Sequence, residues 1–134
     1  METQVWHKLA ANCLINPLTA LHQCKNGELV DLPEWSHYLK TVPEEVARVA
    51  SLSVGNESPL EIYASSLRNF CQVVVEATRD NRSSMLQDVN GGRKTEIDAL
   101  NGYIIRLGKE LNIPVPANSD LYERVTKQTE HTTG

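Results

Sequence analysis

The sequence predicts an all-α protein. Apolar residues recur at three-four spacing along several long stretches, which is the pattern of helices that bury one face against a core. Helix start and stop signals separate these stretches, and no stretch alternates apolar and polar residues as a half-buried strand would. A chain of 134 residues has the length of a single domain with its own hydrophobic core.

The first expected helix, 6–21, is mostly apolar and is the stretch around which the chain is organised. Lys8, Asn12 and Asn16 interrupt it at spacings of four. Positions four apart drift by only about 40° on a helix, so these three side chains, here called the seam, share one stripe. Burying each amide head unpaired would cost about 1–3 kcal/mol, so we expect the seam to line a cleft. Pro17 is expected to kink or break the helix.

The next segments carry turn and helix signals in order. The pair 26–27, Asn-Gly, is typical of a tight turn in which positive φ costs little. Residues 33–54 are expected to form either two short helices or one helix kinked at Pro43. Gly55 then ends the segment, because glycine readily adopts the left-handed conformation after a helix.

A strong helix start follows. Ser58 is expected as the N-cap, Pro59 as the first helical residue and Glu61 as the partner that completes a capping box. A long helix should begin here, with an apolar face that could persist to Val89.

The last third of the chain predicts two more helices. The break at 91–92, Gly-Gly, precedes a second capping box at 95–98, which we expect to open a helix over 97–111. Residues 118–120, Asn-Ser-Asp, can cap a short last helix, and 127–134 is polar and expected to fray.

Composition excludes several classes of function. A net charge of -4 without a cluster of basic residues argues against a nucleic-acid partner. No apolar run approaches the roughly 20 residues that span a bilayer, and no signal peptide begins the chain, so no membrane partner and a cytoplasmic location are expected. The three cysteines suggest reduced thiols, and the four histidines show no zinc spacing, so we assign no metal.

Several short motifs occur in a characteristic order. They are Lys8–Asn12, Asn16–Ala20, Asn26–Leu29, Ser83–Asp88, Thr95–Asp98 and Asn101–Gly102. Together they resemble the C-terminal domain of the ketopantoate reductase (2-dehydropantoate 2-reductase) family over most of the chain. The resemblance implies one helical domain over residues 1–134, of the 6-phosphogluconate dehydrogenase C-terminal-like type. It also implies NADPH-dependent reduction of ketopantoate to pantoate, a step of pantothenate and coenzyme A biosynthesis.

The resemblance also assigns roles to individual residues. Lys8 would be the general acid that protonates the alkoxide formed by hydride attack, and Glu96 would orient Lys8 and lie near the nicotinamide ribose. The substrate contacts would be Asn12, Asn16, Asn26 and Ser84. Without the resemblance, Asn26 reads equally well as a turn former, Ser84 as a small residue tolerated late in a helix, and Glu96 as a complement to a helix dipole.

A dinucleotide-binding unit is missing from this sequence. No Gly-x-Gly-x-x-Gly motif occurs, so we expect the NADPH-binding domain to be absent and to be supplied in cis or in trans. The isolated chain is then expected to be inactive, with ketopantoate, the nucleotide-binding domain and a second copy in a homodimer as its partners. Two alternatives stay open: the second domain of a related 2-oxo acid dehydrogenase, and a non-enzymatic helical interaction module.

Overall fold

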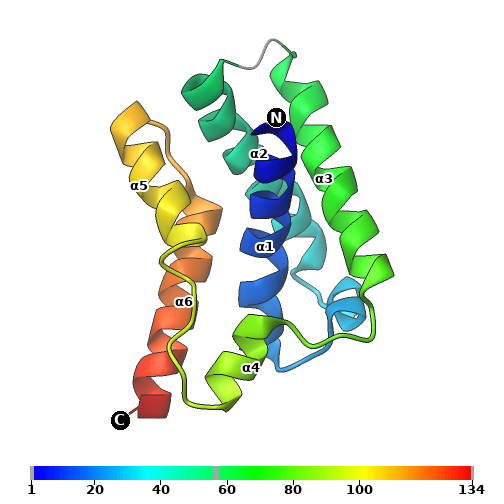
Figure 1. Cartoon of the computed structure of the whole chain (residues 1–134), viewed down its shortest axis with the longest axis vertical. Helices are drawn as coiled ribbons and strands as arrows, with labels where there is room; N and C mark the ends of the chain where they lie inside the picture. The colour runs from blue at the N-terminus through cyan, green and yellow to red at the C-terminus, as the bar shows by residue number, and fades with distance from the viewer. Residues whose placement is uncertain (1, 56–57, 134) are drawn as a thin grey trace.

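Six α-helices and one 3-10 helix make up the structure, a computed structural model that describes residues 2–55 and 58–133. In chain order they are α1 (Glu2–His22), η1 (Asn26–Asp31), α2 (Trp35–Val54), α3 (Leu60–Ala77), α4 (Ser84–Asn90), α5 (Asn101–Leu111) and α6 (Pro116–Thr133) (Figure 1). No strand occurs in these two ranges, and the predicted all-α class is confirmed. Within the same ranges, no helix combines the length and the apolar character needed to cross a bilayer.

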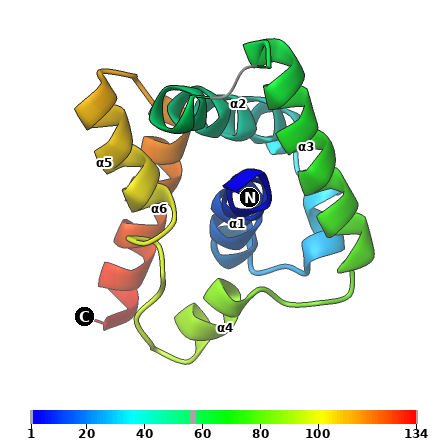
Figure 2. The same cartoon turned by 45° about the horizontal axis from the view of Figure 1, so that its top comes forward.

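Helix α1 forms the centre of the fold. Figure 2 looks down on its N-terminal end and shows α2, α3, α4 and α6 placed around it, and all four contact it. Six of its described side chains are fully buried: Ala10, Cys13, Leu14, Leu18, Thr19 and Ala20. Burying one large aliphatic side chain contributes about 1.5–3 kcal/mol, so α1 supplies the surface on which the other helices bury their own apolar faces.

Pro17 lies inside α1 without ending it. Because proline has no amide hydrogen, the carbonyl of Cys13, four residues earlier, loses its helical donor. The side chain of Asn101 replaces that donor, with Nδ2 lying 3.1 Å from the Cys13 oxygen. The same Nδ2 also donates to Oδ1 of Asn118, at 2.9 Å. The helix therefore continues through the proline because a residue far along the chain repairs the missing bond.

A buried carboxylate completes this chain of hydrogen bonds. Glu45, on α2, is only 5% exposed and accepts three hydrogen bonds at the start of α6. Its donors are the backbone amides of Ala117 (2.8 Å) and Asn118 (2.9 Å) and the side-chain amide of Asn118 (2.8 Å). A helix N-terminus leaves its first amides without partners and carries partial positive charge, so it favours such an anion. Glu45 thus joins α2 to α6, and Asn118 and Asn101 extend the connection to α1.

The predicted cap of the last helix was wrong for this reason. Helix α6 begins at Pro116, before the predicted 118–120 cap, because Glu45 satisfies the first amides. The predicted fraying was also wrong for residues 127–133, since α6 continues to Thr133, while residue 134 lies outside the described residues. Gln128, within the predicted frayed tail, donates from Nε2 to the carbonyl of Ala20 at 2.9 Å and so holds the tail against α1.

The long helix predicted from residue 58 was wrong in its extent. Pro59 holds the N-cap position and α3 begins at Leu60, one residue later than predicted. Helix α3 stops at Ala77, and α4 starts only after residues 78–83. The carbonyls of Arg79 and Asn81 accept hydrogen bonds from the amides of residues 27 and 26, at 2.9 and 3.0 Å. Carbonyls used in this way across the fold cannot serve a continuous helix, so the chain breaks here.

The helix predicted from the 95–98 capping box was also wrong in its start. Those residues form a turn in which the amide of Leu100 donates to the carbonyl of Glu96 at 3.1 Å. Leu100 then departs from helical geometry, with φ -104° and ψ -95°, and α5 begins at Asn101. This departure accompanies the inward position of the Asn101 side chain, which is fully buried and bonded to α1.

Two further expectations are settled by the backbone. Residues 35–54 form one helix that contains Pro43, and Gly55 ends it in the left-handed conformation, φ 70°, as predicted. The predicted tight turn with positive φ at 26–27 was wrong. Residues 26–31 form the 3-10 helix η1 instead, and Gly27 does not adopt positive φ. Gly27 instead allows close approach, since a Cβ there would lie 2.6 Å from the Cβ of Arg79.

The role of Glu45 generates a stability prediction. Glu45→Ala removes the acceptor of three buried donors, so we expect the free energy of unfolding to fall by about 2–4 kcal/mol, given about 1–3 kcal/mol for each unpaired buried group and partial rescue by water. Urea denaturation followed by circular dichroism measures the change. Glu44→Ala, at the neighbouring partly buried position, is the matched control and should change stability by no more than about 0.5 kcal/mol. Equal effects of the two substitutions would contradict the capping role.

Candidate functional site

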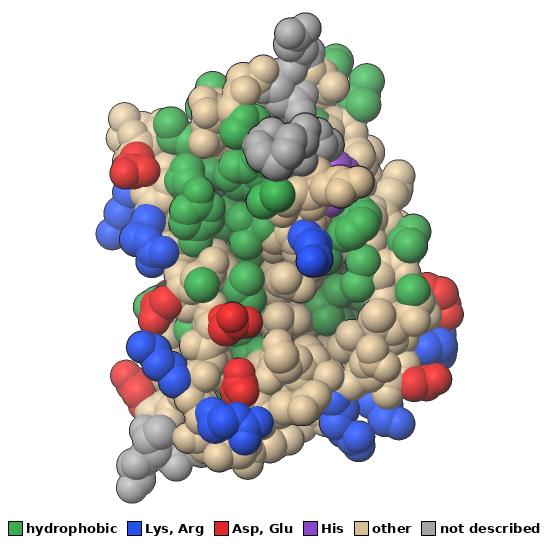
Figure 3. All heavy atoms as spheres, in the orientation of Figure 1, with side chains coloured by type: hydrophobic (Ala, Val, Ile, Leu, Met, Phe, Trp, Pro, Cys, Tyr) green, Lys and Arg blue, Asp and Glu red, His purple; other side chains and the backbone are tan. Residues whose placement is uncertain are grey.

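The seam on α1 is exposed as the spacing predicted. Between residues 6 and 21, all of which the structure describes, only Lys8 and Asn12 are exposed, while Asn16 is half-buried. The side chains of these three residues form no hydrogen bond or ion pair with any other described residue. Figure 3 shows this face of the molecule, hollowed along α1 and bordered by hydrophobic side chains. The seam therefore presents unpaired polar groups on a stretch of α1 that is otherwise largely buried.

The start of α4 lies against α1 near Asn16, at the C-terminal end of the seam. The hydroxyl of Thr19 donates to the carbonyl of Ile15 at 2.9 Å and lies 2.6 Å from the hydroxyl of Ser83. Either of these two hydroxyls can be the donor of the hydrogen bond between them. Ser83 in turn accepts the amide of Leu86 at 3.1 Å and so caps α4. Ser84 is consequently the exposed first residue of a helix that begins beside α1, and not a residue late in α3.

Asn26 is held against the segment that leads to Ser84. Its Nδ2 donates to the hydroxyl of Thr78 at 2.9 Å, and its backbone amide donates to the carbonyl of Asn81. The residue is 7% exposed, and its Oδ1 is buried without a hydrogen-bond partner. Asn26 therefore fixes the position of residues 78–83 relative to α1. Its contact with a substrate stays a prediction.

Glu96 lies apart from the seam in the chain, on the connection between α4 and α5. Its side chain is exposed and forms no hydrogen bond or ion pair with a described residue. Its neighbours Thr95 and Ile97 line a pocket of about 330 Å³ against α6. The hydrogen bond between Thr19 and Ser83 places the start of α4 beside α1, and Asn26 bonds to Thr78 and Asn81 in the segment that precedes Ser84. No hydrogen bond or ion pair joins Glu96 to Lys8. That all six predicted site residues line one cleft stays a prediction.

A second pocket borders Lys8, and residues of α1 and α3 line it. It has a volume of about 510 Å³ and is lined by Gln4, His7, Lys8 and Phe70. Lys8 is thus the one residue of the seam that also lines this pocket, while Phe70 comes from α3. Sequence reasoning missed the pocket, because no local pattern shows which residue of α3 faces Lys8.

The buried thiols do not act as nucleophiles. Burial raises the pKa of Cys13 far above its ordinary value and raises the pKa of Cys71 to about 12. Both thiols therefore stay protonated near neutral pH, and a thiol is a much weaker nucleophile than a thiolate. Among the described residues, no group of three or more His, Cys, Asp and Glu side chains could hold a metal ion.

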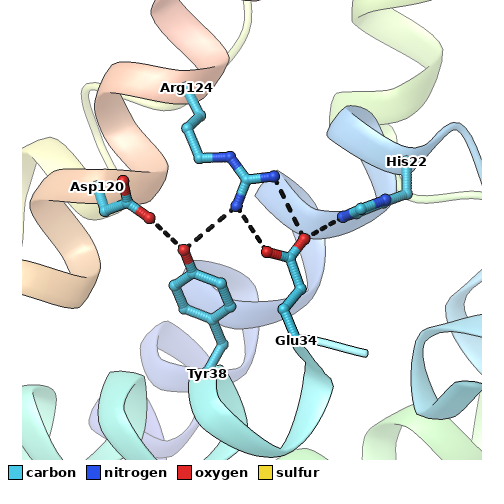
Figure 4. A network of polar contacts seen from close by, with 5 residues as sticks. All are labelled: His22, Glu34, Tyr38, Asp120 and Arg124. Carbon is cyan, nitrogen blue, oxygen red and sulfur yellow. Dashed lines mark hydrogen bonds and ion pairs between the residues drawn. The ribbon is translucent and has the colours of Figure 1, made fainter. Parts of the chain in front are cut away.

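The densest cluster of polar side chains is structural. Arg124, on α6, forms two bonds to the carboxylate of Glu34, at 2.9 and 3.2 Å, and a third to the hydroxyl of Tyr38, at 3.2 Å (Figure 4). His22 also pairs with Glu34, and the Tyr38 hydroxyl donates to Asp120. These contacts join the end of α1 and the start of α2 to α6. Because the members pair with one another, the cluster acts as a clamp and leaves no polar group aimed at a ligand.

The chain matches a known protein family. The family model described as "Ketopantoate reductase PanE/ApbA C terminal" matches residues 1–129. A curated relative, 2-dehydropantoate 2-reductase of Vibrio cholerae serotype O1, is 42% identical over 125 residues, which is 93% of this chain and 40% of the relative. The 2-dehydropantoate 2-reductase of Bacillus subtilis is 44% identical over 99 residues, 74% of this chain and 30% of the relative.

A solved structure agrees with the sequence matches. The PanE/ApbA family ketopantoate reductase of Ralstonia eutropha JMP134 superposes with a TM-score of 0.81 at 32% identity, and the match covers 100% of this chain and 43% of that one. The chain thus spans less than half the length of the relatives that it matches. The helices described above correspond to one part of a longer protein in those relatives.

The clamp generates a prediction about pH. Partial burial alone would raise the pKa of Glu34, but its bonds to Arg124 and His22 hold that pKa below its ordinary value. A carboxyl whose pKa is lowered by folding stabilises the fold above its unfolded pKa of about 4.3, and this contribution is lost as the pH falls through the folded pKa. Glu34→Gln should therefore reduce stability at pH 7 and weaken the acid-induced loss below about pH 4.

Urea unfolding at pH 7 and at pH 3 measures this effect. Glu110→Gln, at an exposed glutamate of α5, is the control and should keep the acid-induced loss of the unmodified chain. An acid-induced loss that is unchanged in Glu34→Gln would remove Glu34 from the pH dependence.

Proposed function

The chain belongs to the ketopantoate reductase family through its helical C-terminal domain, and we propose that it provides the substrate-binding and proton-donating half of an NADPH-dependent 2-dehydropantoate 2-reductase. In this role it would help to convert ketopantoate to pantoate. The observation that carries the proposal is the seam on the central helix: Lys8 and Asn12 are exposed, Asn16 is half-buried, and none of the three side chains has a partner among the described residues. Polar groups without protein partners on a rigid helix are free to bond a ligand.

Lys8 has the chemistry of the proton donor. Hydride addition to a 2-oxo acid places negative charge on the former keto oxygen, and a nearby ammonium both stabilises that charge and donates a proton. Lys8 is the only lysine or arginine on α1, and no described carboxylate pairs with it. NADPH would supply the hydride, and the residues of this chain would bind the acid, orient its carbonyl and donate the proton.

The amides suit the remaining oxygens of the substrate. Asn12 and Asn16 follow Lys8 at successive four-residue intervals, so along α1 they lie about 6 and 12 Å from it, given 1.5 Å of rise per residue. An amide can donate to a carboxylate and accept from a hydroxyl, both of which ketopantoate carries. Ser84 adds a hydroxyl at the start of α4, and the backbone amide of Asn26 bonds to the carbonyl of Asn81 in the segment that precedes it. Glu96 is proposed to approach Lys8 and the nicotinamide ribose in the complete enzyme.

The relation to the nucleotide is part of the proposal. The Gly-rich turn and helix N-terminus that hold a dinucleotide pyrophosphate do not occur among these 134 residues. We propose that a nucleotide-binding domain, in the same polypeptide or in a partner, closes over the seam. Closure would exclude water and strengthen the bonds made by Lys8 and the two amides.

The role of Lys8 predicts a loss of turnover on substitution. In an enzyme that combines this chain with a nucleotide-binding domain, Lys8→Ala should lower kcat by about 10²- to 10⁴-fold, the usual contribution of a positioned acid. Folding should survive, because Lys8 is exposed and no described residue pairs with it. Lys40→Ala, at an exposed lysine of α2, is the control. A Lys8→Ala enzyme with normal kcat would eliminate Lys8 as the acid.

The division between two domains predicts the behaviour of the chain alone. The purified chain should show a helical circular dichroism spectrum yet neither bind NADPH measurably nor oxidise it in the presence of ketopantoate. Addition of a separately produced nucleotide-binding domain, for example from the Vibrio cholerae relative, should restore NADPH oxidation that depends on ketopantoate. Robust oxidation by the chain alone would contradict the proposed division, and inactivity of the folded mixture would count against the enzymatic role.

A further inference from the structure

One side of the pocket beside Lys8 is formed by His7 packed against side chains of α3. The imidazole of His7 meets the ring of Phe70 edge to face, with centroids 5.5 Å apart and planes at 85°. It also meets Tyr63 at 6.3 Å and 62°, and its Nε2 lies 2.8 Å from the hydroxyl of Ser66. These contacts hold the imidazole in place against α3, so this wall exists before any ligand arrives. We call the space that it borders the His7–Phe70 pocket.

Lys8 divides two environments of different polarity. Along α1 beyond Lys8 lie the amides of the seam, which suit charged and hydroxylated groups. To its side lies the His7–Phe70 pocket, whose lining includes the Phe70 ring, an apolar group that suits carbon substituents. A 2-oxo acid has the same division, since its carboxylate and keto oxygens are polar and its substituent is carbon. With the keto oxygen at Lys8 and the carboxylate toward Asn12, the substituent is left to extend into the pocket.

We propose that the His7–Phe70 pocket receives the carbon substituent of the 2-oxo acid and favours bulky branched or aromatic substituents. The inference rests on the proposed function, because it takes Lys8 as the group that meets the keto oxygen. The volume of about 510 Å³ lies within the range of about 300–1,000 Å³ usual for small-molecule sites. The short branched substituent of ketopantoate would leave most of this volume unfilled, so larger 2-oxo acids are accommodated as well.

Binding of two probe acids to the full chain tests the proposal. Phenylpyruvate carries an aromatic ring and pyruvate only a methyl group, while their carboxylate and keto groups are the same. In a titration followed by ¹H–¹⁵N NMR, phenylpyruvate should shift the signals of His7, Lys8 and Phe70 and bind about 10-fold more tightly than pyruvate, the lower end of the effect of a carbon group in an apolar pocket. Equal affinities for the two acids would overturn the proposal.

Two tryptophan variants localise the preference. Gln4 lines the pocket and is exposed, so Gln4→Trp should fill the space without disturbing the core and should abolish the 10-fold preference for phenylpyruvate over pyruvate. Asn69→Trp is the matched control, because Asn69 is exposed on α3 next to Phe70 but does not line this pocket. A preference that survives Gln4→Trp, or that is lost equally in Asn69→Trp, would overturn the assignment.

The reconstituted enzyme separates failure of the inference from failure of the proposed function. Normal turnover of ketopantoate without a preference for phenylpyruvate would overturn the pocket assignment alone. Phenylpyruvate binding at His7 and Phe70 without any turnover of ketopantoate would support the pocket and count against the proposed reaction. If adding the nucleotide-binding domain shifted the same signals and blocked phenylpyruvate, the pocket would be a domain contact, and the assignment would be overturned.

Discussion

The fold depends on the buried chain of hydrogen bonds that begins where Pro17 removes an amide from α1. A proline in a helix interior costs about 3 kcal/mol, in part because one carbonyl loses its donor. Asn101 supplies that donor, Asn118 accepts from Asn101, and Glu45 accepts from Asn118 and from the start of α6. These bonds are directional and dry, so they set how α1, α2, α5 and α6 lie relative to one another more specifically than apolar packing alone could.

The fixed position of α1 preorganises the side chains of the seam. A helix covered by neighbours on most of its surface can expose polar side chains in only one direction, and Lys8 and Asn12 occupy that direction. Their backbone cannot turn without breaking the core contacts of α1, so their positions are set before a ligand arrives. Such preorganisation lowers the entropic cost of binding and aligns a proton donor with its acceptor. Packing and site chemistry therefore depend on the same helix.

Sequence patterns predicted the helices better than their boundaries. The apolar periodicity of α1 and the glycine after α2 depend on neighbouring residues, and both were predicted correctly. The break after α3 and the start of α6 depend on hydrogen bonds between residues more than 50 positions apart, which no local pattern contains. The same distinction holds for the site. Spacing on one helix predicted the exposed seam, but the burial of Asn26 and the contact between Thr19 and Ser83 required the folded chain.

Pairing separates the polar groups that hold the fold from those that can act on a ligand. Arg124, Glu34 and Tyr38 satisfy one another, and any ligand that took one of them would have to replace bonds that already exist. Lys8 and Asn12 have no such bonds to lose, so a ligand gains each interaction in full against hydration alone. A pocket with aromatic walls opens at one end of this unpaired group and amides stand at the other. Because the two ends differ in polarity, the proposed substrate, an acid with an apolar substituent, would be oriented along α1 in one direction, with its reactive carbon next to Lys8, the only lysine or arginine on the helix.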